Sequence, residues 1–435
     1  VRTQEDGRWA FAHGMLREAL QQRARADGRW SRWNALCARV LGDRGDPDPV
    51  RLAEHLLAAG SLDAALGPLL DAIDLHLDRA DYSAAERTLR QRLRALRTLR
   101  VVPESPRWPE TGLRWSAVRL IAGDVQRAVR QAERAARQAA RIGDAALLVR
   151  ALLELGRARH AAAGPEAAWP AFARALGRLP ELDDLALATR LRSMAGWCLV
   201  EQGRYDAAER TLAVALSALR QVDLPRLRGD VLRNLADMAR RRGQLDRAEK
   251  FNTRAARAYY RAGARRALAR AALIQGDIER YRGKLDEAAA RYREAGRMLR
   301  AVGSADSAIA DINQGLLLIE LEQYREARAV LEEAAGVAGN QRMMVALASV
   351  CLLPCDAWLG DWPAWDRHWQ RVEPIRDGQL ADPDIAGVAR LAAKLALAAG
   401  DPQRADEARK LAVAQLEALG RMDEAAELRW ARPVR

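Results

Sequence analysis

A six-residue pattern that returns every 40 residues constrains the fold of this chain more than any other sequence feature. The pattern has Gly at its first position, Tyr or Leu at the third and Ala at the sixth, and it spans Gly203–Ala208, Gly243–Ala248 and Gly283–Ala288. Altered copies extend the series at intervals of 38 to 40 residues: Gly123…Ala128, Pro165…Ala168, Tyr324…Ala327, Trp362…Trp365 and Gly400…Ala405. A repeat of this length predicts stacked supersecondary units rather than one compact core.

Two further sets of small residues keep the phase of the pattern. Seven positions after its last residue stand Ala135, Ala175, Ala215, Ala255, Ala295, Ala334 and Ala412, with Val372 as the exception. Upstream of the pattern stand Gly156, Gly196, Ala236, Gly276 and Gly315. Small residues on one helical face let two helices approach closely. Each unit is therefore predicted to be a helix pair.

The turn between the two helices of a unit has its own residue requirements. The pattern Gly can adopt the positive φ that ends the first helix. The Asp that follows it, at Asp206, Asp246 or Asp286, can cap the second helix. The composition agrees, because Ala, Leu, Arg and Glu dominate, and aromatic residues make up only 5% of the chain. We expect an all-α chain with almost no strand.

These positions together resemble the tetratricopeptide family, over about residues 110 to 430. The resemblance implies a right-handed superhelical solenoid of helix pairs, with a period of about 40 residues in place of the usual 34. The longer period implies helices about one turn longer, or longer connectors. HEAT-like pairs have a similar period but lack this turn pattern, and they are the minor alternative.

The charge of the chain bears on its partners. A net charge of +13 would ordinarily indicate nucleic acid or an anionic membrane. However, the 71 basic residues are interleaved with 58 acidic ones rather than collected in a block. We therefore favour a solvated, salt-bridged surface over a nucleic-acid-binding surface, and we expect no membrane association. Four Cys in 435 residues form no disulfide framework, which favours a reducing cytoplasm.

The N-terminal residues do not fit the repeat. The run from Trp9 to Leu20 resembles the end of the winged-helix segment in signal-transduction ATPases with numerous domains, and residues 33–65 resemble their helical arm. In such ATPases a His at the position of His13 can face the nucleotide phosphates. Without a nucleotide domain, we interpret His13 as an amphipathic position that has no substrate. The chain begins at Val1 in mid-pattern, so we expect a C-terminal fragment of a larger protein.

Four parts are expected along the chain. Residues 1–100 form a helical arm that follows a winged-helix remnant, and residues 101–109 form a proline-rich connector. Residues 110–350 form the regular repeats, and residues 351–435 form atypical capping repeats. Trp358, Trp362, Trp365 and Trp369 gather in this last part. They indicate either an aromatic ligand pocket or the filling of a terminal cap, and we favour the cap.

No catalytic constellation is predicted. Gly283-Lys284-Leu285 lacks both the earlier Gly and the following Ser or Thr of a phosphate loop. The five His residues are scattered, without a His-x-x-x-His pair for zinc. We expect no cofactor, no metal and no enzymatic activity in this chain. Any ATPase or kinase domain would lie outside it.

A binding surface is predicted instead, because stacked helix pairs expose a wall of first helices along an inner groove. The tetratricopeptide frame places these residues on that wall: Arg190, Ser193, Trp197, Asp230, Arg233, Asn234, Asp237, Arg270, Asp277, Arg280 and Asn313. Trp197 is the expected aromatic anchor for a ligand. Asn234 and Asn313 match a position where family members often bind a peptide backbone, although Asn is also common there for structural reasons.

The sequence thus predicts a non-catalytic sensor and scaffold region of a larger bacterial signalling ATPase, which can also carry an N-terminal protein kinase. Its expected partner is a protein or peptide, an inducer, or the ATPase domain of the same polypeptide. One alternative is an autonomous adaptor that bridges two proteins. A nucleic-acid-binding helical repeat is the less favoured alternative.

Overall fold

The computed structural model describes residues 2–3, 9–10, 14–43, 47–79, 81–304, 306–339, 341–376 and 380–430. This part of the chain is mostly α-helical, and its one sheet pairs the two-residue strands β1 (Arg2–Thr3) and β2 (Trp9–Ala10) in antiparallel fashion. The all-α prediction is confirmed. His13 lies outside the described residues. Contacts divide the chain into two compact units, residues 1–121 and 122–435.

The first unit contains the predicted arm. Its helices are α1 (Gly14–Ala26), α2 (Trp30–Gly42), α3 (Pro49–Ala58), α4 (Leu62–Asp78), α5 (Tyr82–Thr98) and α6 (Arg107–Ile121). Arg92 of α5 is buried and donates a hydrogen bond to Thr111 Oγ1 of α6 at 2.9 Å. Helix α6 includes Pro109, so the end of the predicted proline-rich connector is helical, because Pro is tolerated in the first turn of a helix. The boundaries of the four-part division otherwise stay predictions.

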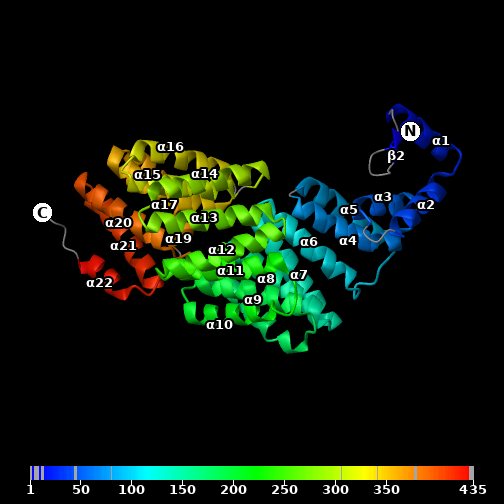
Figure 1. The fold of residues 1–435 in the computed structure, drawn as a ribbon, viewed down its shortest axis with the longest axis horizontal. Helices are drawn as coiled ribbons and strands as arrows, with labels where there is room; N and C mark the ends of the chain where they lie inside the picture. Colours follow the sequence, from blue (N-terminus) through cyan, green and yellow to red (C-terminus); the bar gives the residue numbers. More distant parts are fainter. Residues whose placement is uncertain are drawn as a thin grey trace. The chain divides into compact units, whose positions relative to one another are not determined.

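The second unit is the repeat array, and its successive helices pack side by side (Figure 1). Its α-helices are α7 (Val125–Ile142), α8 (Ala145–Leu176), α9 (Leu185–Glu201), α10 (Tyr205–Ala218), α11 (Pro225–Arg241), α12 (Leu245–Arg261), α13 (Arg265–Tyr281), α14 (Leu285–Ala301), α15 (Ser307–Glu320), α16 (Tyr324–Ala338), α17 (Arg342–Leu359), α18 (Trp362–Arg371), α19 (Glu373–Arg376), α20 (Pro383–Ala398), α21 (Pro402–Ala418) and α22 (Met422–Trp430). A 3-10 turn lies at Leu179–Glu181. Helix α8 is two helices of one repeat, because Ala163 and Gly164 interrupt it with non-helical dihedral angles. This part of the chain is a solenoid of tetratricopeptide-like helix pairs, as the sequence predicts.

The repeat pattern explains the turns between paired helices. Gly203, Gly243 and Gly283 have φ angles of 70°, 72° and 75°, so each adopts the left-handed conformation that ends a first helix. The expectation that the Asp after this Gly caps the second helix is wrong. Asp206 and Asp246 lie inside the first helical turn and make no cap.

These Asp residues connect consecutive repeats instead. Asp206 pairs with Arg242 at 2.5 Å, and Asp246 pairs with Arg282 at 2.5 Å. In each case the arginine lies 36 residues further along the chain, just before the turn of the next repeat. The pairs are partly exposed, so each adds little net stability, but they repeat with the period of the array.

The small residues of the first helices mark close helix crossings. A Cβ atom added at Gly156 would lie 2.4 Å from the ring of Phe172, and one added at Gly196 would lie 2.6 Å from Leu212. Gly276 and Gly315 show the same relation to residues of the following helix. The first and second helices of a repeat therefore pack at a distance that only Gly allows at these points.

The tryptophan cluster near the last repeats is mostly packing. Trp365 is fully buried in a core cluster that joins α16, α17, α20 and α21, and Trp362 and Trp369 pack partly buried against it. Trp358 is half exposed and lies against Tyr324. Three of the four tryptophans thus contribute to the core around these helices.

Helix α17 also belongs to this core. It is the one described helix that is long and apolar enough to cross a membrane by length and composition alone. About two thirds of it, 67%, is buried inside the fold, and it packs against α16, α18 and α20. These properties are those of a core helix.

Candidate functional site

The predicted site residues lie on α9, α11, α13 and α15, the first helices of four successive repeats. Successive first helices contact each other directly, whereas contacts between successive second helices are sparse in the described part of the chain. We call the surface that these four helices share, which carries the predicted residues, the A-helix wall. Its N-terminal half lies nearer to the helix starts, and its C-terminal half lies nearer to the helix ends.

The N-terminal half of the wall carries most of the basic candidates. Arg190 of α9 is exposed, and Arg233 of α11 and Arg270 of α13 are half-buried. Asp230 accepts a hydrogen bond from the Tyr259 hydroxyl at 2.9 Å. Burial lowers the pKa of Arg233, but Tyr259 and Asp230 beside it more than offset this, so that pKa is raised.

Arg270 differs from its neighbour. Its pKa is lowered, first by burial and then by the positive charge of Arg233, and the charge of Asp306 only partly compensates. Asp306 itself is bound by Arg266 at 3.0 Å. Among the described residues, no carboxylate lies within salt-bridge distance of Arg270. A partly buried guanidinium without such a partner is a group that an added carboxylate would stabilise.

Trp197 is packed rather than free. It lies on α9 with its ring 4.1 Å from the ring of His160, at an interplanar angle of 39°. His160 in turn pairs with Glu201 through Nε2. One face of Trp197 is therefore covered by the chain itself, and the side chain is half-buried.

The two asparagines are both engaged within the array. Asn234 is buried and its Nδ2 donates to the Ser193 carbonyl at 2.9 Å and to the Ser193 hydroxyl at 3.2 Å. Asn313 donates to Asp277 Oδ1 at 2.9 Å. These bonds join α9 to α11 and α13 to α15. Of the two roles that the sequence allows for these asparagines, the geometry supports the structural one.

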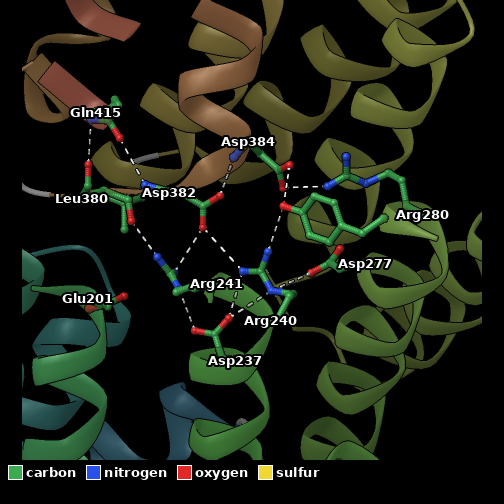
Figure 2. Close-up of polar contacts among 12 residues, drawn as sticks. Glu201, Asp237, Arg240, Arg241, Asp277, Arg280, Leu380, Asp382, Asp384 and Gln415 are labelled. Carbon is green, nitrogen blue, oxygen red and sulfur yellow. Dashed lines mark hydrogen bonds and ion pairs between the residues drawn. The ribbon is translucent and has the colours of Figure 1, made fainter. Parts of the chain in front are cut away.

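A segment far away in the sequence covers the C-terminal half of the wall. Residues 380–384, which we call the clasp segment, precede and begin α20, and their acidic side chains point at α11 and α13 (Figure 2). Arg241 contacts Asp382 at 3.2 Å and donates to the Ala381 carbonyl at 2.6 Å. Arg280 contacts Asp384 at 2.7 Å.

Neighbouring groups complete this network. Arg240 contacts Asp237 at 2.9 Å and Asp382 at 3.5 Å. The Tyr281 hydroxyl donates to Asp384 at 2.8 Å. Figure 2 shows Asp237, Arg240 and Arg241 of α11 converging with Asp382 of the clasp segment.

Helix α21 also holds the clasp segment in place. Gln415 of α21 donates to the Leu380 carbonyl at 3.0 Å and accepts from the Asp382 amide at 3.1 Å. A second contact lies nearby in the chain, where the Ala418 carbonyl approaches Gly203 so closely that a Cβ atom there would be 2.9 Å away. Helices α20 and α21 are thus attached to repeats that precede them by more than 100 residues.

The charges of the network affect its carboxyl groups differently. Burial raises the pKa of Asp237, but Arg241 and Arg240 more than offset it and hold that pKa far below its usual value. The pKa of Asp384 is lowered in the same way by Arg280. Asp277 is the opposite case, because burial dominates and raises its pKa to about 6.

Sequence reasoning did not find the polar network between the clasp segment and the wall, which we call the clasp. It placed Asp237, Asp277 and Arg280 on the wall, but it did not include Arg240, Arg241, Tyr281, Asp382 or Asp384. The run Asp382-Pro383-Asp384 reads as an ordinary helix start, with Asp382 as the N-cap residue, and Asp382 does fill that role. No local signal shows that the same carboxylates meet arginines of α11 and α13.

The arrangement offers binding chemistry. Among the described residues, no group of three or more His, Cys, Asp or Glu could hold a metal ion. The Ser193 hydroxyl accepts a hydrogen bond from Asn234, and no general base accompanies it in the described network. Burial raises the pKa of the Cys198 and Cys355 thiols to about 12, so neither provides a thiolate near neutral pH.

Comparison with known proteins identifies the fold. No protein-family model matches the sequence, and no curated protein matches it. Among solved structures, Rap protein complexed with competence and sporulation factor has a TM-score of 0.61 and 11% identity, over 83% of this chain and 99% of that chain. NprR in complex with its cognate peptide NprX has a TM-score of 0.55 and 14% identity, over 81% and 98%. Aspartyl phosphate phosphatase F from Bacillus subtilis has a TM-score of 0.50 and 12% identity, over 73% and 96%. At these identities the likeness shows the helical-repeat fold.

Proposed function

We propose that this chain is a non-catalytic sensor region that binds an extended acidic peptide along the N-terminal half of the A-helix wall. The observation that carries the proposal is the pair Arg233 and Arg270. Their positive charges lie close enough to interact, and no described carboxylate forms an ion pair with Arg270. A bound carboxylate would relieve the repulsion and supply the missing partner.

The surroundings of this pair favour a peptide over a small molecule. Arg190 and Arg270 occupy the same position of the repeat, 80 residues apart in the sequence. A ligand that reaches both arginines must extend across three first helices, α9, α11 and α13. Two of the similar structures, described as complexes with competence and sporulation factor and with the peptide NprX, support the use of this fold for such ligands.

An enzymatic role is not part of the proposal. One similar structure is named a phosphatase, but that likeness concerns the fold. In the described part of this chain, the hydroxyl and thiol groups discussed above are either hydrogen-bonded within the array or held as thiols. The wall therefore supports recognition, and any chemistry would be carried out by a separate domain or partner.

The binding proposal is tested with display-selected acidic peptides, whose affinity is measured by fluorescence anisotropy. Arg270→Gln removes one charge from the wall, and we expect a loss of about tenfold or more in affinity. Arg254→Gln on the exposed side of α12 is the matched control and should leave affinity unchanged. Equal binding by Arg270→Gln, Trp197→Ala and wild type would mean that the peptides do not bind at the wall.

We further propose that the region belongs to a cytoplasmic signalling ATPase and keeps it inactive until the peptide binds. The resemblance of residues 9–20 and 33–65 to the winged-helix end and arm of such ATPases supports this context. The coding sequence upstream of Val1 is the test. A Walker motif there agrees with the ATPase, whereas a start codon would favour an autonomous adaptor.

A further inference from the structure

The charged groups of the clasp are buried, which is rare for ionised side chains. The side chains of Arg240, Arg241 and Arg280 are only 6%, 7% and 3% exposed. Those of Asp382 and Asp384 are 14% and 19% exposed. Removing charged groups from water costs free energy, and close partners of opposite charge must compensate that cost.

The clasp does not follow the geometry of the repeat. The other long-range ion pairs of the array, such as Asp246 with Arg282, join neighbouring repeats. By contrast, Arg241 and Ala381 are 140 residues apart, and Arg280 and Asp384 are 104 residues apart. Stacking of neighbours does not require these contacts, so they need another explanation.

The clasp segment contacts the wall as a peptide ligand would. It has extended backbone at Asp382, with φ of −143° and ψ of 138°. It presents two carboxylates and one backbone carbonyl to the wall, and all three are bound by arginines. The clasp segment covers Arg280 and lies beside Asp237. The sequence assigns both of these residues to ligand binding.

We propose that residues 380–384 are a built-in ligand of the A-helix wall. They occupy its C-terminal half in cis and exclude acidic peptides from the arginines there. A partner is thereby restricted to the N-terminal half, with Arg190, Arg233 and Arg270. This proposal deepens the peptide-binding function proposed above and rests on it for its biological meaning, but the cis occupancy can be tested without the display-selected peptides.

The test separates the charge of the clasp segment from its shape. The double variant Asp382→Asn, Asp384→Asn keeps the size of both side chains, and Asn remains a good N-cap for α20. The control is Asp401→Asn. Asp401 also caps a helix and precedes a proline, but it forms its ion pair with Arg404 of its own helix rather than with the wall.

Two measurements report the result. Hydrogen exchange by mass spectrometry should show faster exchange at residues 380–386 and at the end of α11 in the double variant, and no change there in the control. The second probe is a labelled hexapeptide with the sequence of residues 380–385, followed by fluorescence anisotropy. It should bind the double variant about tenfold or more tightly than it binds wild type or Asp401→Asn. The same hexapeptide with both Asp replaced by Asn should not bind.

Two outcomes would overturn the proposal. One is wild type binding the hexapeptide as tightly as the double variant does, because the wall would then be unoccupied in solution. The other is a double variant that is folded by circular dichroism yet shows neither faster exchange nor hexapeptide binding.

If the double variant does not fold, the single variant Asp384→Asn decides, because it removes only the charge that Arg280 binds and should show a smaller change in both measurements. Failure of the selected peptides to bind the N-terminal half would instead refute the proposed function and leave the cis occupancy standing.

Discussion

Asp277 allows a quantitative test of the electrostatics of the wall. Its side chain is only 13% exposed, and its Oδ1 accepts hydrogen bonds from the Tyr292 hydroxyl and from Asn313 Nδ2, both at 2.9 Å. Arg240 is 3.8 Å away. Burial nevertheless dominates and raises the pKa of Asp277 from 3.8 to about 6.

The sign of the pH effect follows from this shift. Between about pH 4 and pH 6 the folded chain holds a proton on Asp277 that the unfolded chain has released. The free energy of unfolding therefore falls as pH rises through this window. A shift of about two pKa units corresponds to about 3 kcal/mol, as an upper limit for this one group.

Asp277→Asn should remove this penalty. The amide keeps an oxygen in the place of Oδ1, so that it can still accept from Tyr292 and Asn313. At pH 7 we expect the free energy of unfolding to rise by up to about 3 kcal/mol, and near pH 4 we expect little difference from wild type. Asp286→Asn, an exposed position in the first turn of α14, is the control and should stay within about 0.5 kcal/mol.

Urea denaturation at pH 4, 5, 6 and 7, followed by circular dichroism, measures these differences. The result that would refute the reasoning is an Asp277→Asn variant less stable than wild type at pH 7. It would mean that ionised Asp277 stabilises the fold through Arg240, and that burial is not the dominant cause. An unchanged pH dependence in the variant would refute it equally.

The remaining predictions concern packing and are checked by urea denaturation at neutral pH. Gly156→Ala places a Cβ atom 2.4 Å from the buried ring of Phe172, and overpacking should lower the free energy of unfolding by about 1–2 kcal/mol after the gain in helix propensity. Gly387→Ala has nothing within 4 Å and should raise it by about 0.5–1 kcal/mol. Trp365→Ala should lower it by about 3–5 kcal/mol, whereas Trp358→Ala, at a position 48% exposed, should change it by about 1 kcal/mol or less. The opposite ranking of the two tryptophans would contradict their interpretation as a packed cap.

The sequence predicts the array well because its determinants are local. A Gly such as Gly243 must have a positive φ, and a Gly such as Gly276 must face a large side chain of the next helix. Both requirements act within one helix pair and recur with the period. The number and order of the helix pairs can therefore be read from spacing alone.

The local chemistry of the turns was harder to predict. Asp246 is a residue type favoured at N-caps, but it is the second residue of α12, where its side chain meets Arg282 of the next repeat. Propensity does not distinguish a cap residue from a first-turn residue two positions later. The ion-pair partner in the next repeat determines the role of the Asp, and that partner can be identified only when neighbouring repeats are stacked.

The wall could be located from the sequence, but its occupancy could not. Trp197 and Asn234 lie on the predicted helices, yet His160 covers one and Ser193 engages the other. The clasp depends on how far the array curves over several repeats, because Arg280 and Asp384 are brought together only through all the packing between them. No residue pattern within a single repeat records that curvature.

The distance in sequence across the clasp also has a consequence for synthesis of the chain. Arg280 of α13 leaves the ribosome 104 residues before Asp384 does, and the arginines of α11 leave it earlier still. At about 5–20 residues per second, this leaves a window of roughly 5 to 20 s. During that window neighbouring helix pairs can already stack, while the C-terminal half of the wall still lacks its carboxylates. The nascent array is therefore at its most receptive to foreign acidic chains before its own C-terminal repeats exist.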